Sequence, residues 1–132
     1  FYIRTRLGDQ DESRQRLLGA MFETDYPYAE EHEKIIDYAI VFEGMDGDDI
    51  AGYVWFYRMA EDESIWAIHL MVFDGYKGRF FRRSVVNSFF GAMYSLGCNI
   101  VRAANWHQDL LLRVGGKQNS EFVDLKLPHI WR

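Results

Sequence analysis

The residues best suited to chemistry lie in one stretch of the sequence, FDGYKGRFFRR, at residues 73–83. Two glycines and three arginines gather there, just where a helical pattern begins. Glycine lets a ligand approach the backbone, and the free N–H groups and dipole at the start of a helix favour an anion. Arginine side chains add charge-assisted hydrogen bonds. The stretch therefore predicts an anion-binding helix entrance, with a strand-to-helix turn carrying solvated arginines as the alternative.

His69 is the best candidate for a general base and lies within the apolar run WAIHLMV. An imidazole whose pKa is near neutrality can take a proton from an ammonium group. A lone histidine in an apolar strand also fits a satisfied core position, so both interpretations stay open. His107 and Asp109 begin the last predicted helix, where we interpret them as capping residues.

The composition limits the classes of protein to which this chain could belong. The 132 residues are 48% hydrophobic and 27% charged, which is typical of one globular domain over residues 1–132. The net charge of −5 argues against non-specific binding to duplex nucleic acid. The single cysteine, Cys98, cannot form an internal disulfide. We interpret it as a small buried residue of a protein in a reducing compartment. With neither a membrane-spanning run nor a signal peptide in view, we expect a cytoplasmic protein without a metal site.

The two parts of the chain carry opposite charge. Residues 1–75 hold 17 Asp and Glu against 6 Lys and Arg, whereas residues 76–132 hold 3 against 9. One part could therefore face an anionic ligand and the other a cationic one. Solvated surfaces without a ligand are the alternative.

Alternating and helical patterns predict the elements that must position these residues. Asp9 and Glu12 resemble a capping box before the first helix, which ends near Pro27. The middle helix spans residues 81–96 and ends at Gly97. A short helix at residues 107–114 stops at two glycines. The predicted strands span residues 2–6, 35–43, 50–59, 64–73, 99–104 and 120–127.

This order of elements predicts an α/β (α+β) fold in which the three central strands form an antiparallel meander. The helix at residues 81–96 then connects two strands as a right-handed crossover, which makes those strands parallel. The expected result is a mixed, mostly antiparallel twisted sheet of about six strands with helices on both faces.

The element order, with a loop of glycines and arginines before the middle helix, resembles the GCN5-related N-acetyltransferase (GNAT) superfamily. The resemblance covers the order of nearly the whole chain and, at the level of motifs, residues 65–116. In the superfamily an Arg/Gln-x-x-Gly-x-Gly/Ala loop holds the pyrophosphate of acetyl-CoA on backbone N–H groups. VFDGYKGRFFRR occupies that place, and Phe80 and Arg82 fall at the two small positions if Lys77 is the basic one. The resemblance implies cofactor contacts from Val72, Lys77, Gly78, Arg79, Phe80, Phe81, Arg82, Arg83 and Asn105.

Further superfamily positions lie near the fifth predicted strand. Asn105 ends IVRAAN and Gly116 follows eleven residues later, the spacing usual in the superfamily. Asn105 could hydrogen-bond the amide-bearing arm of coenzyme A, or it could cap a turn. The usual tyrosine acid is replaced by Leu112, which cannot transfer a proton, and the usual phenylalanine by Lys117. Other candidate acids are Tyr26, Tyr28 and Tyr38, whose hydroxyl groups the sequence does not place.

The resemblance implies an acyl-CoA-dependent N-acyltransferase that moves acetyl from acetyl-CoA to an amine, with His69 or a water held by it as the base. The first helices shape the acceptor site in this superfamily. Their acidic residues imply a basic acceptor, a small molecule or protein amine, bound by Glu23, Asp25 and Tyr28. A solvated helix face is the alternative for these charges.

A second interpretation is a binding protein that has lost chemistry. The stretch from Gly78 to Trp106 is similar to small GNAT-like proteins of tailed bacteriophages. That resemblance implies a role in virion or head assembly, or as a binding module, with a phage or host protein as partner. The protein would then act in the host cytoplasm, without a membrane partner. The sequence leaves the oligomeric state open.

Overall fold

The computed structural model describes residues 1–104 and 107–132 and contains one seven-stranded sheet. Its strands follow the order β1-β2-β3-β4-β5-β7-β6, and β4 and β5 are the parallel pair while the other neighbours pair antiparallel. This confirms the mixed, mostly antiparallel sheet and the crossover between its parallel strands. The strands are β1 (Tyr2–Thr5), β2 (Ile40–Asp46), β3 (Asp49–Arg58), β4 (Ile65–Val72), β5 (Ile100–Ala103), β6 (Lys117–Asn119) and β7 (Phe122–Lys126).

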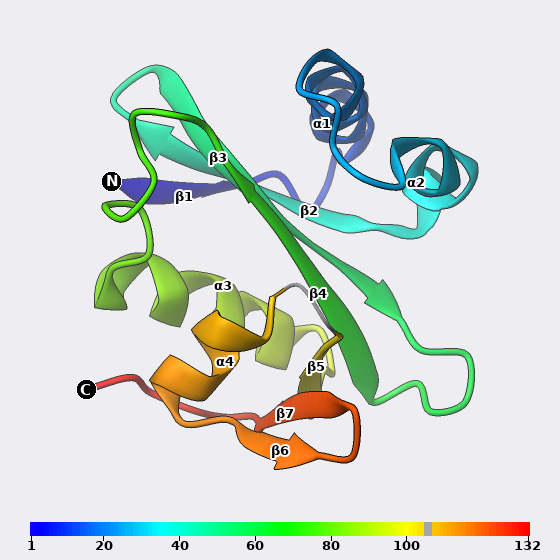
Figure 1. The fold of residues 1–132 in the computed structure, drawn as a ribbon, viewed down its shortest axis with the longest axis vertical. Helices are drawn as coiled ribbons and strands as arrows, with labels where there is room; N and C mark the ends of the chain where they lie inside the picture. The colour runs from blue at the N-terminus through cyan, green and yellow to red at the C-terminus, as the bar shows by residue number, and fades with distance from the viewer. Residues whose placement is uncertain (105–106) are drawn as a thin grey trace.

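Helices cover both faces of the sheet, as the sequence predicted (Figure 1). On one face, α1 (Asp11–Glu23) and α2 (Ala29–Ile35) pack on a cluster that includes Trp55. On the other face, α3 (Arg83–Ser95) and α4 (Gln108–Val114) pack on a cluster that includes Phe56. Because successive residues of a strand point to opposite faces, β3 alone supplies rings to both clusters. None of the helices within residues 1–104 and 107–132 is long and apolar enough to cross a membrane.

A buried carboxylate joins α1 to β2. Glu43 is completely buried and accepts two hydrogen bonds from Arg16, with one more from Ser13. Arg4 of β1 completes the ion-pair cluster at 3.1 Å. A buried charge is costly unless it is paired and hydrogen-bonded, so these contacts fix where α1 and the loop after it lie on the sheet.

Several predicted boundaries were wrong. The strand predicted at residues 35–43 begins only at Ile40, because α2 reaches Ile35 and a 3₁₀ turn follows it. The first helix begins at Asp11, and Gln10 takes the N-cap place instead of Asp9. The side chain of buried Gln10 accepts a hydrogen bond from the backbone N–H of Val41 and donates one to its carbonyl oxygen. Gln10 therefore holds the start of α1 against β2. The short strand β6 was not predicted, since its three residues are polar and exposed.

Candidate functional site

The sheet opens between its two parallel strands. Residues 65–67 of β4 pair with residues 100–102 of β5, and β4 then extends to Val72 without a further pairing to any described residue of β5. The carbonyl of Ser64 accepts a bond from the N–H of Ile100, so it faces β5. Because backbone groups alternate along a strand, those of Ile68 and Leu70 face the same, open edge. The divergence therefore directs a row of backbone hydrogen-bonding groups toward the gap between β4 and β5, and among them the carbonyl of Leu70 accepts a hydrogen bond from the Tyr26 hydroxyl.

Two hollows follow this open edge. The larger has a volume of about 660 Å³ and lies between the α1–α2 loop and the end of β4, where Val72 and Lys77 line it. The smaller, of about 280 Å³, is lined by Ala67, His69 and other residues nearer the junction of the two strands. Tyr26 and Pro27 line both hollows. Tyr26 and Pro27 lie between the two hollows, which follow one another along β4 from its end toward the point where the strands meet, and we call this stretch the path.

Aromatic and histidine rings gather at the inner end of this path. The ring of His69 lies 4.8 Å from that of His32 and 5.9 Å from that of His107, measured between centroids. Trp55 stacks on His69 at 5.7 Å. His32 hydrogen-bonds through Nδ1 to the hydroxyl of Tyr57 at 3.0 Å. The structure thus surrounds the predicted base with rings from α2, β3 and the start of α4.

The surroundings of His69 hold its ring neutral. Burial, together with the neighbouring His32 and His107, lowers the pKa of His69 to about 3. Burial likewise lowers the pKa of His107 to about 4 and that of His32 below its usual value. Among the described residues, no group of three His, Cys, Asp or Glu side chains is arranged to hold a metal ion. The cluster is therefore a neutral set of proton acceptors and hydrogen-bonding groups.

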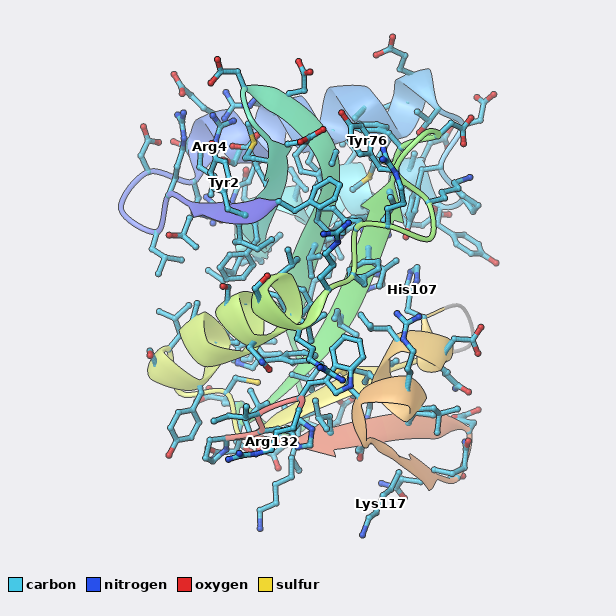
Figure 2. The ribbon with its side chains drawn as sticks, turned by 90° about the vertical axis from the view of Figure 1, so that its left-hand side faces the viewer. Tyr2, Arg4, Tyr76, His107, Lys117 and Arg132 are labelled. Atoms are coloured by element: carbon cyan, nitrogen blue, oxygen red, sulfur yellow. The ribbon has the colours of Figure 1, made fainter. Side chains whose placement is uncertain are left out.

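Tyr26 and His107 form a pair that the sequence did not predict. The Tyr26 hydroxyl lies 3.1 Å from His107 Nε2 and 3.4 Å from the carbonyl oxygen of Leu70. His107 does occupy the N-cap place of α4, but its side chain makes no capping hydrogen bond. The interpretation of His107 as a capping side chain was therefore wrong: its ring reaches the α1–α2 loop instead. Figure 2 shows His107 just before α4 and Tyr76 on the loop that leads into α3.

That loop is built around a buried phenylalanine. Phe80 is completely buried against β2, where Gly44 leaves room for it: a Cβ on Gly44 would collide with the Phe80 ring. Phe81 packs edge-on against Phe80 and is half-buried. Phe80 belongs to the core cluster on the α3 side of the sheet, and Phe81 packs against that cluster. Gly75 and Gly78 have φ of +87° and +80°, which other residues rarely adopt.

The three arginines at the start of α3 make different contacts. Arg79 donates to the carbonyl of Gly75 and lies over the Tyr76 ring, so it holds the loop in shape. Arg82 donates to the carbonyl of Arg79 and lies over Phe1. Arg83 is exposed in the first turn of α3, a turn without acidic residues. A cation is unfavourable at a helix N-terminus unless an anion offsets it. The entrance is thus suited to an anionic ligand.

The predicted acceptor residues lie at different places. Asp25 lines the larger hollow and Tyr28 the smaller one, and both have positive φ in the α1–α2 loop. Glu23 is exposed at the end of α1. A further hollow, which Asp25 and Tyr28 also line, adds Glu30 and Glu31 from α2. The α1–α2 loop therefore brings several carboxylates close to the path.

The remaining predicted positions are less informative. Asn105 lies outside the described residues. Gly115 ends α4 with a φ of +115°, as predicted, and Leu112 is half-exposed on that helix. Lys117 lies on β6 at the opposite end of the molecule from Tyr76 (Figure 2). Cys98 is buried, which confirms its predicted place in the core.

Comparison with known proteins shows the fold. No family model matches the sequence, and no curated protein matches it. A GNAT-family structure from Desulfovibrio desulfuricans matches with a TM-score of 0.71 and 13% identity, over 94% of this chain and 97% of the other. A GNAT-family acetyltransferase from Brucella melitensis in complex with acetyl-CoA matches with a TM-score of 0.67 and 18% identity, over 98% and 90%.

Aminoglycoside 6′-acetyltransferase type Ii matches with a TM-score of 0.64 and 15% identity, over 96% of this chain and 97% of the other. These matches extend over nearly the full length of each chain, so they concern the whole sheet and its helices. At such low identity the likeness is one of architecture, and the chain has the fold of the GNAT acetyltransferases.

Proposed function

We propose that this protein transfers an acyl group, acetyl in the simplest case, from acyl-CoA to an amine. One observation carries the proposal: along the open edge of β4 lie a hollow lined by Lys77, on the loop before α3, and a hollow lined by His69 and its neighbouring rings. The GNAT fold supports it, as does the acetyl-CoA bound in the Brucella melitensis structure. The phage-assembly alternative gains no support from the structures compared above.

The donor would lie along the open edge. The amides of the pantetheine arm would pair with backbone groups of Ile68, Leu70 and Val72, where β5 no longer does so. The pyrophosphate would lie at the start of α3, where the N–H groups of residues 83–85 have no partner within the helix. Arg83 and Lys77 would add charge, while Gly78, Arg79, Phe80, Phe81 and Arg82 would shape the loop. Asn105 remains a proposed contact with the arm.

The chemistry would take place among the rings. The amine nitrogen attacks the thioester carbonyl carbon, and its proton passes to His69 directly or through a water. The pKa of His69, about 3, keeps the ring neutral at pH 7, and it also makes the ring a weaker base than the imidazole of ordinary pKa that the sequence predicted. The same low pKa means that the ring holds the proton only briefly before passing it to solvent. The acceptor would enter along the α1–α2 loop, where Asp25, Tyr28 and Glu23 favour a basic amine.

The first test is binding. Calorimetry and thermal unfolding with acetyl-CoA should show one site, with a stabilisation of about 2.7 kcal/mol at a hundredfold excess over Kd. Turnover is then measured as thiol release with a panel of polyamines, aminoglycosides and lysine peptides. His69→Ala should lower kcat by about 10²–10⁴ without changing the acetyl-CoA Kd. His129→Ala is the control, because the His129 ring contacts Val114 at the C-terminal end of α4 and lines neither hollow of the path. No stabilisation at millimolar acetyl-CoA would contradict the proposal.

A further inference from the structure

The leaving thiolate of coenzyme A needs a proton, and this requirement rests on the proposed function. Leu112 stands at the position that resembles the usual acid, and its side chain has no proton to give. The site therefore needs another donor beside the open edge of β4. Four tyrosines are candidates for this donor. Tyr26, Tyr28 and Tyr38 are the acids that the sequence suggested, and Tyr57 lies beside the rings of His32 and His69.

Tyr26 alone among these four tyrosines has its hydroxyl placed on the open edge. Its oxygen lies 3.4 Å from the carbonyl oxygen of Leu70, whose backbone groups face the gap left by β5. Tyr26 lines both hollows and therefore lies at the junction between them. A thioester lying along β4 with its acyl end toward His69 would bring its sulfur to this junction.

The other tyrosines are less suitable. The Tyr57 hydroxyl is bonded to His32 on the α2 side of β3 and does not line either hollow of the path. The side chain of Tyr28, in the α1–α2 loop, is 64% exposed, and that of Tyr38, in the 3₁₀ turn after α2, is 76% exposed. Tyr26 is partly buried, and burial raises its pKa, so the hydroxyl keeps its proton at neutral pH.

We propose that Tyr26 is the general acid that protonates the leaving sulfur, and that His107 is its positioning residue. In the resting protein the Tyr26 hydroxyl donates to Leu70, which leaves its oxygen to accept the N–H of His107 Nε2. This arrangement orients the tyrosine and would stabilise the phenolate that forms. The acid is thus supplied by the α1–α2 loop, on the opposite side of the path from α4.

The step balances. The amine nitrogen forms a bond to the acyl carbon while the carbon–sulfur bond breaks, and the sulfur takes the hydroxyl proton of Tyr26. The Tyr26 phenolate regains its proton from solvent, while the N–H of His107 keeps its hydrogen bond to the phenolate oxygen. The amine proton leaves through His69. The net change moves one proton from the amine to the thiol, with no oxidation or reduction.

The test uses two acetyl donors that differ in the acidity of the leaving thiol. Acetyl-CoA releases an alkyl thiolate, which needs a proton, whereas S-acetyl-4-nitrothiophenol releases a stable aryl thiolate. Tyr26→Phe should lower kcat with acetyl-CoA by about 10²–10⁴, the range of a lost general acid. The same variant should stay within a few-fold of wild type with the aryl thioester. Acetyl-CoA Kd by calorimetry should be unchanged, and Tyr38→Phe is the matched control.

His107→Gln keeps a side-chain N–H and should lose less activity with acetyl-CoA than Tyr26→Phe does. An equal loss with both donors would overturn the proposal, because it would mean that Tyr26 only supports the structure. Full activity of Tyr26→Phe with acetyl-CoA would also overturn it. A wild-type protein that binds and turns over no acetyl-CoA would instead contradict the proposed function itself, and the two failures are therefore distinguishable.

Discussion

At the scale of single residues, His69 illustrates how far its surroundings decide a side chain's chemistry. The sequence predicts the residue but assigns it an ordinary imidazole pKa. In the structure, rings from distant parts of the chain enclose it, among them His32 and His107. Their separation in sequence follows no helical or strand period, so no pattern could have linked them. The same holds for Tyr26, whose partner lies 81 residues away.

The histidine cluster predicts a pH-dependent stability. Unfolded histidines titrate near pH 6.5, whereas His69 and His107 titrate near 3 and 4 in the folded protein. The unfolded state therefore binds more protons below pH 6.5, so stability is full above that pH and falls as the pH drops toward 4. The slope is at most about 1.4 kcal/mol per pH unit for each histidine.

Denaturant unfolding at pH 7, 6 and 5 would measure this slope. His69→Gln should flatten it, since one of the depressed groups is removed. Tyr38→Phe, an exposed substitution outside the cluster, provides the reference slope. A His69→Gln variant with the reference slope would show that His69 titrates alike in the folded and unfolded states.

At the scale of elements, the sequence predicts the order well and some boundaries poorly. The meander and the crossover follow from alternation and from the helical stripe of Val85 and Phe89, which α3 confirms. The helix start was placed two residues early because Phe81 continues that stripe. Phe81 lies before α3 because Phe80 is anchored against Gly44, a contact between segments 36 residues apart. A local sequence pattern cannot predict a contact between segments that lie so far apart in the chain.

The start of α3 predicts opposite effects for one substitution. Arg83→Ala removes an exposed cation from a helix N-terminus, so the protein without ligand should gain about 0.3–1 kcal/mol. That gain corresponds to a rise in Tm of about 1–5 °C. The same substitution should weaken acetyl-CoA binding, because the pyrophosphate loses a charge partner.

Thermal unfolding with and without acetyl-CoA measures both effects on one sample. Arg113→Ala, which removes an arginine from the last turn of α4, is the control and should not raise Tm. A lower Tm for Arg83→Ala without ligand would mean that Arg83 stabilises the folded loop before α3. Unchanged affinity would remove Arg83 from the proposed donor site.

At the scale of the whole molecule, the uneven charge of the sequence acquires a spatial meaning. The acidic α1–α2 region lies on one face of the sheet, and the basic entrance of α3 lies beyond the end of β4 (Figure 1). Under the proposed function, the anionic acetyl donor binds at the basic end of the path, and the cationic amine acceptor binds at the acidic end. Charge counts predict such a separation, and the structure adds that hollows near both regions lie along β4.

This separation predicts how acceptors are selected. With saturating acetyl-CoA, a diamine should be preferred over a neutral-tailed monoamine of equal length, because Asp25, Glu30 and Glu31 attract the second charge. Glu31→Lys should lower kcat/KM for the diamine several-fold and leave the monoamine nearly unchanged. Raising the salt concentration should reduce the wild-type preference, because exposed charges are screened. Glu61→Lys makes the same charge change on the β3–β4 connection and should preserve the preference. Equal effects of the two lysine variants would show that net charge, and not the carboxylates of α2, selects the acceptor.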